Sequence, residues 1–137
     1  MKNNTTLEYP IRETADDEVP AEYRDVDAVV AGLNAGQRAF CDAVMLALED
    51  PTAPRLFFLT GVAGTGRTHT CNTLIAYCLS KDIKVVVTAY TDITANFMIS
   101  GVTSNEAFGL PFEDAGLNMN RSNIKLQSKE AERFREC

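Results

Sequence analysis

The fold is decided by the stretch Leu59-Thr60-Gly61-Val62-Ala63-Gly64-Thr65-Gly66-Arg67-Thr68. Its spacing is that of a phosphate-binding loop, in which Gly is followed by four residues and then by Gly, Lys and Ser or Thr. Arg67 stands where this pattern has lysine. Glycines let backbone N–H groups approach a polyphosphate closely, and the helix that follows adds the partial positive charge of its N-terminus. A glycine-rich turn without any ligand is the alternative.

The sequence on either side of this loop predicts one βαβ unit. Residues 56–59 are a continuous apolar run, which is typical of a parallel strand buried on both faces. Residues 83–88 are rich in valine and predict a second such strand, joined to the first by a right-handed crossover. Between them, residues 67–80 predict an amphipathic helix. Its apolar stripe consists of Cys71, Leu74, Ile75, Cys78 and Leu79. We therefore expect an α/β fold with a mostly parallel sheet flanked by helices.

Further helices are indicated by capping residues and apolar spacing. Asn34 fits the N-cap of a helix that continues to about Glu49. Thr103 is followed three residues later by Glu106, which is the spacing of a capping box. The apolar residues of the first of these helices are Phe40, Ala43, Val44, Ala47 and Leu48. Two more helices are predicted over residues 92–98 and 124–136, and a loop over residues 109–120.

Length and charge indicate one domain behind an acidic leader. The 137 residues are enough for one ordinary domain and too few for two. The net charge is −6, and residues 1–27 contain eight acidic and three basic side chains. We expect residues 1–30 to form a flexible leader and residues 31–137 to form the domain. No signal peptide or membrane-spanning apolar run is recognised, so a soluble, intracellular protein is expected.

The cysteines and the single histidine suggest no metal site. The four cysteines lack metal-ligand spacing, so we expect reduced thiols. His69 is interpreted as a helix residue near the loop without a chemical role.

Several segments besides the loop form a specific combination. They are Leu33-Asn34-Ala35-Gly36-Gln37-Arg38, Pro54-Arg55-Leu56-Phe57-Phe58-Leu59, Asn72-Thr73-Leu74-Ile75-Ala76-Tyr77, Thr91-Asp92-Ile93-Thr94-Ala95, and the stretch from Thr103 to Pro111. Together they resemble the start of the eukaryotic petite-integration-frequency (Pif-type) DNA helicases, especially copies carried by Helitron-type transposons. The resemblance covers roughly residues 31–137.

The resemblance implies a RecA-like P-loop NTPase motor that uses ATP and Mg²⁺ for 5′-to-3′ movement on single-stranded DNA, in DNA repair and recombination. It implies a nuclear location, although no localisation signal is recognised. Arg67 would be the catalytic contact to the β- and γ-phosphates, Thr68 would coordinate Mg²⁺, and Gln37 would read the adenine. The phosphates would be cradled by Gly61, Ala63, Gly64, Thr65 and Gly66, and the DNA would be contacted by Thr91, Thr103 and Asn105.

Departures from the family pattern leave other interpretations open. Besides Arg67, Asp92 stands where a glycine is usual and Asn105 where a histidine is usual. The sequence ends at Cys137, before the strand expected to carry the Asp-Glu pair for Mg²⁺, so we expect an incomplete motor, an N-terminal fragment that is inactive alone. One alternative is a non-catalytic, nucleotide-binding transposon remnant, and another is a different P-loop enzyme such as a kinase. A basic stripe on the last helix either faces nucleic acid or is solvated; it comprises Arg121, Lys125, Lys129 and Arg133.

Overall fold

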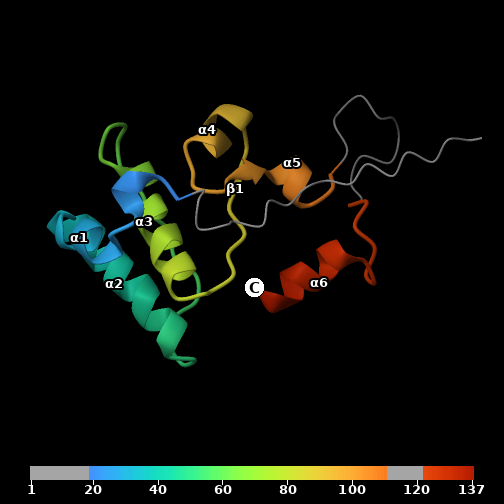
Figure 1. The fold of residues 1–137 in the computed structure, drawn as a ribbon, viewed down its shortest axis with the longest axis horizontal. Helices are drawn as coiled ribbons and strands as arrows, with labels where there is room; N and C mark the ends of the chain where they lie inside the picture. Colours follow the sequence, from blue (N-terminus) through green and yellow to red (C-terminus); the bar gives the residue numbers. More distant parts are fainter. Residues whose placement is uncertain (1–18, 111–121) are drawn as a thin grey trace, which may run out of the picture. The chain divides into compact units, whose positions relative to one another are not determined.

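The computed structural model describes residues 19–110 and 122–137, which form two compact units (Figure 1). The first unit contains the glycine-rich loop and comprises the described residues up to Val85. The second comprises the described residues from Val86 onward. Most of the expected leader and of the expected 109–120 loop lies outside the described residues. No helix in the described ranges is long and apolar enough to cross a membrane.

Four helical elements build the first unit. They are the 3₁₀ helix η2 (Ala21–Tyr23) and the α-helices α1 (Val26–Ala31), α2 (Ala35–Glu49) and α3 (Arg67–Ser80). The bounds of α2 and α3 confirm the predictions from capping and periodicity. Asn34 caps α2 through a reciprocal capping box with Gln37, whose backbone N–H donates to Asn34 Oδ1 at 3.0 Å. The Gln37 side-chain oxygen accepts from the Asn34 backbone N–H at 3.1 Å. Two of the N–H groups left over at the start of α2 are therefore satisfied locally.

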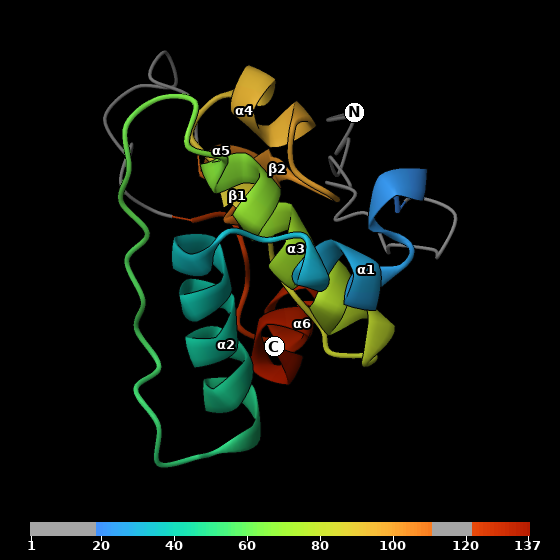
Figure 2. The same ribbon diagram turned by 90° about the vertical axis from the view of Figure 1, so that its left-hand side faces the viewer.

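The first predicted strand is absent. Residues 56–59 are part of a coil between α2 and α3, shown in green in Figure 2, with no ladder to any described residue. Leu56 is 94% exposed and Phe58 is 89% exposed. Phe57 makes an edge-to-face contact with Phe40, with ring centroids 6.3 Å apart. A strand with two apolar faces is stable only when neighbouring strands and covering helices bury both faces. The prediction that residues 56–59 form a buried strand was wrong.

The buried face of helix α3 coincides only in part with its predicted apolar stripe, of which Ile75 and Cys78 are buried. Leu74 and Leu79 are only half-buried, whereas Thr70 and Thr73 are almost fully buried. This buried face is the one that α1, α2 and η2 cover. Cys41 of α2 is fully buried, with Sγ 4.0 Å from the Thr70 carbonyl oxygen. The apolar stripe is left partly uncovered because the predicted strand beside it does not form.

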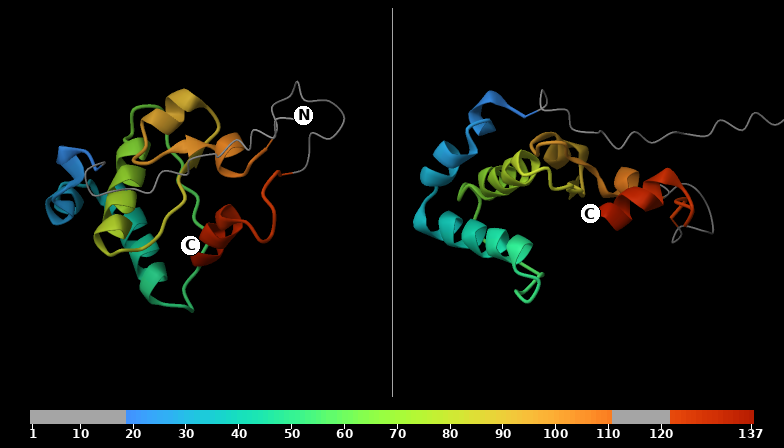
Figure 3. Two further views of the ribbon diagram at one scale, coloured as in Figure 1. Left: turned by 45° about the vertical axis from the view of Figure 1, so that its right-hand side comes forward. Right: turned by 60° about the horizontal axis from the view of Figure 1, so that its bottom comes forward.

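Helical structure begins at Ala21, within the segment of residues 1–30 that was expected to be a flexible leader. Asp25 caps α1 by accepting from the Ala28 backbone N–H at 3.1 Å. The guanidinium of Arg38 donates to the Val30 carbonyl oxygen at 3.2 Å, which joins α1 to α2. Figure 3 shows η2 and α1 in blue; both precede α2 in the chain. Residues 21–30 are therefore helical over most of their length.

The second unit is built around a small parallel sheet. Its elements are β1 (Thr88–Ala89), α4 (Asp92–Asn96), β2 (Val102–Thr103), α5 (Ser104–Ala107) and α6 (Lys129–Glu136). Strand β1 pairs in parallel with β2, in the register Thr88↔Val102 and Ala89↔Thr103. The predicted strand over residues 83–88 is thus reduced to its last residue and one beyond, and the crossover that joins the paired strands contains α4 instead of α3.

Helix α6 begins later than its pattern predicts. Residues 124–128 are not helical, because Ser128 is the N-cap and its side chain accepts from the Ala131 backbone N–H at 3.3 Å. The helix is held to the rest of the unit by stacked rings of Phe108 and Phe134, whose centroids are 5.4 Å apart. Within the described residues, Lys125 thus lies outside the helix that was expected to carry the basic stripe.

Candidate phosphate-binding site

The loop has the backbone conformation that its glycines allow. Gly64 and Gly66 adopt φ values of +82° and +81°, in the left-handed region that L side chains rarely occupy. A Cβ at Gly61 would lie 2.6 Å from Thr65 Oγ1. At Gly64, by contrast, a Cβ would meet nothing within 4 Å. The loop is therefore tight on its inner side and open at Gly64, where a ligand has room to approach.

The loop is closed by its own threonine. The Thr65 hydroxyl donates to the Val62 carbonyl oxygen at 2.8 Å, and the Thr65 backbone N–H donates to the same oxygen at 3.4 Å. Both groups of Thr65 therefore point into the turn. The side chain and the backbone N–H of Thr65 thus both stabilise the loop in the ligand-free structure.

The N-terminus of α3 presents unused N–H groups beside this loop. Gly66 is the N-cap and forms no side-chain capping bond. The first bond of the helix runs from the Thr70 backbone N–H to the Gly66 carbonyl oxygen at 2.9 Å. The N–H groups of Arg67, Thr68 and His69 precede that bond and have no partner in the helix. A helix of 14 residues with an uncapped N-terminus is suited to bind an anion.

Arg67 and Thr68 are exposed at the first two positions of α3. Arg67 extends back along the loop, since its Cδ would lie 3.7 Å from a Cβ at Gly61. Among the described residues, no hydrogen bond or ion pair engages its guanidinium. Burial raises the pKa of the Cys71 thiol one turn later, and the charge of Arg67 partly opposes that rise. The residues present fit a polyphosphate, with a cation and a hydroxyl at the mouth of the loop.

Gln37 lies against the loop. Its side-chain N–H₂ group donates to the Thr65 carbonyl oxygen at 3.2 Å. A Cβ at Gly66 would lie 2.5 Å from Gln37 Nε2. The structure therefore brings the expected adenine-reading residue to the phosphate loop, and engages its amide there.

Comparison with known proteins now identifies the family. A family model described as PIF1-like helicase matches residues 32–137. The chain belongs to the PIF1-like helicase family. The members of this family have a P-loop NTPase fold, and the loop and α3 are the described parts of it; the small parallel sheet is consistent with that class.

Two curated relatives are similar to part of the chain. The chain is 31% identical over 80 residues to "ATP-dependent DNA helicase PIF6" of Trypanosoma brucei brucei, covering 58% of this chain and 10% of that protein. It is 40% identical over 57 residues to "ATP-dependent DNA helicase Pif1" of Psychrobacter sp., covering 42% of this chain and 8% of that protein. The matches span about a tenth of these helicases. No solved structure matches the chain significantly.

The residues that the resemblance led us to expect at a DNA contact lie in the second unit. Thr91 caps α4, and its hydroxyl accepts from the Thr94 backbone N–H at 3.3 Å. Thr103 caps α5 by accepting from the Glu106 backbone N–H at 3.2 Å. Asn105 is half-buried within α5. Since Thr103 pairs with Ala89, two residues before Thr91, both threonines lie near the carboxyl ends of the paired strands.

Contacts of three polar residues, two at the start of α3 and one in η2, were not predicted from the sequence. The Thr70 hydroxyl donates to the Gly66 carbonyl oxygen at 2.9 Å and is 1% exposed. The Tyr23 hydroxyl lies 3.0 Å from Nδ1 of His69, so this histidine does have a partner. The sequence contains no local signal for the contact with Tyr23, because the two residues are 46 positions apart.

The cysteines are free thiols in the structure. All four cysteines are unpaired, and burial raises the pKa of Cys41, Cys71 and Cys78. The described residues contain no group of three or more His, Cys, Asp and Glu side chains that could hold a metal ion.

Proposed function

We propose that the chain supplies the ATP-binding loop of an ATP-dependent DNA helicase, with Mg·ATP bound by residues 61–68. The observation that carries this proposal is the start of α3, where Gly66 caps the helix with no side-chain bond, directly after the exposed loop at Gly64. The free N–H groups and the helix dipole favour a phosphate there. Membership in the PIF1-like family and the printed names of both relatives support the helicase assignment.

The chain's own residues take the following roles in this proposal. Backbone N–H groups of the loop bind the phosphates, Arg67 neutralises charge on the β- and γ-phosphates, and Thr68 offers its hydroxyl to Mg²⁺. The Mg²⁺ ion supplies further charge neutralisation when it is bound. Gln37 donates to the Thr65 carbonyl oxygen in the ligand-free structure, and the second N–H of its amide is the donor that we assign to adenine. Thr91, Thr103 and Asn105 are proposed to contact single-stranded DNA.

The second candidate function is nucleotide binding without hydrolysis. The observation that favours it is Arg67 at the lysine position of the loop. Arginine keeps the positive charge, but its planar fork directs the donors differently from a compact ammonium group. Transition-state stabilisation depends more strongly on geometry than ground-state binding does. The Helitron-type origin, the role in DNA repair and recombination, and nuclear residence stay predictions from the resemblance.

Calorimetric titration of Mg·ATP into the chain tests the proposal, with Arg67→Lys and the matched control Arg55→Lys run beside it. Arg55 is also exposed and lies in the coil before the loop. Saturable binding to the wild type and to Arg55→Lys supports an ATP site. Binding to Arg67→Lys alone favours a loop inactivated by arginine. If none of the three proteins binds, the proposed ATP site is wrong.

Phosphate release, measured with and without single-stranded DNA, separates the two candidate functions in a protein that joins this chain to the rest of a helicase motor, because the chain matches only about a tenth of its relatives. The helicase proposal expects that Arg67→Lys turns over faster than the wild type and that DNA stimulates both proteins. Saturable binding with no phosphate release from any variant supports the non-catalytic alternative. Equal rates for arginine and lysine would show that this position is neutral.

A further inference from the structure

The segment before the family domain is built onto the phosphate-binding helix. The family model matches residues 32–137, whereas η2 and α1 occupy residues 21–31. Both elements nevertheless pack on α3. We call residues 21–31 the N-terminal clip.

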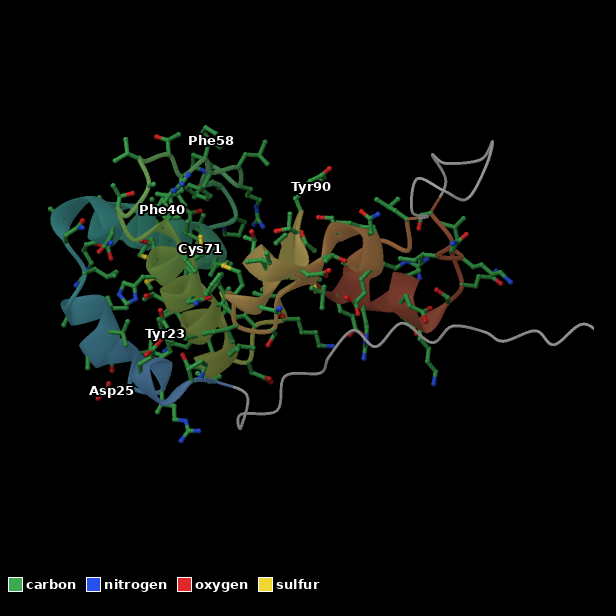
Figure 4. The ribbon with its side chains drawn as sticks, turned by 90° about the horizontal axis from the view of Figure 1, so that it is seen from above. Tyr23, Asp25, Phe40, Phe58, Cys71 and Tyr90 are labelled. Atoms are coloured by element: carbon green, nitrogen blue, oxygen red, sulfur yellow. The ribbon has the colours of Figure 1, made fainter. Side chains whose placement is uncertain are left out.

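Tyr23 is the central contact of the clip. Tyr23, labelled in Figure 4, is 6% exposed. Its hydroxyl lies 3.0 Å from Nδ1 of His69. The two rings are also in contact, with centroids 5.5 Å apart and planes inclined by 41°. Burial raises the pKa of Tyr23, although its hydrogen bond with Asn72 lowers it in part. The hydroxyl therefore keeps its proton at neutral pH and remains available as a donor.

This contact is made at the part of α3 that the phosphate site uses. His69 is the third residue of the helix and directly follows Arg67 and Thr68. The carbonyl oxygen of His69 accepts from the hydroxyl of Thr73 at 2.8 Å. The first turn of a helix, like the last, has fewer backbone bonds than an interior turn, so its order depends more strongly on side-chain contacts. Tyr23 supplies such a contact to the turn whose N–H groups face the loop.

We propose that the N-terminal clip fixes the first turn of α3 and so preorganises the phosphate loop, with Tyr23 as a positioning residue that acts through His69. The consequence for a ligand rests on the proposed ATP site. A loop that is already ordered loses less conformational freedom on binding, so docking of the clip increases affinity for phosphate groups. The clip is a feature of this chain that the family match does not include.

Tyr23→Phe in the full chain tests the proposal, because it removes the hydroxyl and keeps the ring. The matched control is Tyr77→Phe, which makes the same change on α3 itself, near its C-terminus, where the ring lies under the ammonium of Lys81. Amide hydrogen exchange of the ligand-free protein should become about threefold to tenfold faster over residues 64–70 in Tyr23→Phe. Residues 74–80 should be unaffected. Mg·ATP binding should weaken up to about tenfold, while Tyr77→Phe changes neither quantity.

A merely structural role of Tyr23 gives a different pattern. Exchange would then rise evenly over the whole of α3, or equally in Tyr77→Phe, and either result overturns the proposal. His69→Ala provides the second test. The effect of Tyr23→Phe on residues 64–70 should be smaller in that background, because only the hydrogen bond with Asn72 is then left to lose. Additive effects would show that Tyr23 does not act through His69. If wild-type protein fails to bind Mg·ATP, the proposed ATP site fails, whereas the exchange comparison still decides whether the clip positions the loop.

Discussion

The side-chain amide nitrogen of Gln37 lies 3.2 Å from the carbonyl oxygen of Thr65, so the first turn of α2 is hydrogen-bonded to the glycine-rich loop 28 residues later. The amide oxygen of Gln37 accepts from the Asn34 backbone N–H at 3.1 Å. One side chain thus completes a capping box and holds the loop. The amide nitrogen carries two N–H groups, so the one that Thr65 does not use can donate to a nucleotide base.

Gln37→Glu separates the two functions of this side chain. Glutamate is a good partner in a capping box and suits the start of a helix, so α2 should keep its stability to within about 0.5 kcal/mol. The carboxylate cannot donate to Thr65 and repels its carbonyl oxygen. Mg·ATP binding should weaken roughly tenfold, as measured by calorimetry. Gln127→Glu is the charge control, because it adds the same carboxylate at an exposed position outside any helix. Equal weakening by both variants would assign the effect to net charge.

Gly66→Ala should disrupt the loop more than Gly64→Ala, although both residues have nearly the same positive φ. Strain at such a position costs about 1–3 kcal/mol. At Gly66 the new Cβ would also lie 2.5 Å from Gln37 Nε2 and displace it, whereas at Gly64 it meets nothing within 4 Å. Urea unfolding should therefore show the larger loss for Gly66→Ala.

Gly36→Ala is the matched control for these loop variants. Gly36 lies in the first turn of α2, where a Cβ would make only ordinary contact with Asn34 Oδ1 at 3.6 Å. Alanine favours a helix over glycine by up to about 1 kcal/mol, so this variant should be neutral or stabilised. Equal destabilisation of Gly66→Ala and Gly64→Ala would show that the contact between Gln37 and the loop does not contribute to the free energy of unfolding.

The helices around the loop were predictable because their signals are local. Asn34 and Gln37 form a capping box within four residues, and α3 begins directly after the last loop glycine. The start of α6 at Lys129 was missed, because the capping role of Ser128 is not distinguished by periodicity alone. The strand over residues 56–59 failed for another reason. Its apolar residues form a strand only when both faces of that strand are buried. This burial depends on neighbouring strands and helices from elsewhere in the sequence.

The features of the site are likewise of two kinds: local ones, which the sequence predicts, and long-range contacts, which it does not. The positive φ values of Gly64 and Gly66 follow from the spacing of the glycines. The bond from Gln37 to Thr65 and the contact of Tyr23 with His69 join residues 28 and 46 positions apart. No sequence pattern encodes such pairs, since they result from the packing of α2 and η2 around the loop and α3.

Thr70→Val should weaken phosphate binding while Thr73→Val should not. Both hydroxyls donate to a carbonyl oxygen four residues earlier, at 2.9 and 2.8 Å, and both residues are almost fully buried. Each valine should lower the free energy of unfolding by about 0.5–1.5 kcal/mol, since one hydrogen bond is lost. The bond of Thr70, however, ends on Gly66 of the loop. Calorimetry should therefore show weaker Mg·ATP binding for Thr70→Val alone, and equal effects of the two variants would exclude a specific role of Thr70.

Cys41 should make the fold sensitive to alkaline pH. Burial raises the pKa of its thiol from about 9 to about 11, with a smaller contribution from the carboxylate of Asp42. The unfolded chain therefore releases the thiol proton at a lower pH than the folded chain does. The stabilisation is complete below pH 9 and is lost as the pH rises toward about 11.

Cys41→Ala should cost stability at every pH, because it leaves a small cavity, but its free energy of unfolding should fall less steeply between these values. Urea unfolding at a series of pH values measures both slopes, and the exposed Cys137→Ala should retain the wild-type slope. Parallel curves for wild type and Cys41→Ala would show that the pKa of this thiol is the same in the folded and the unfolded protein.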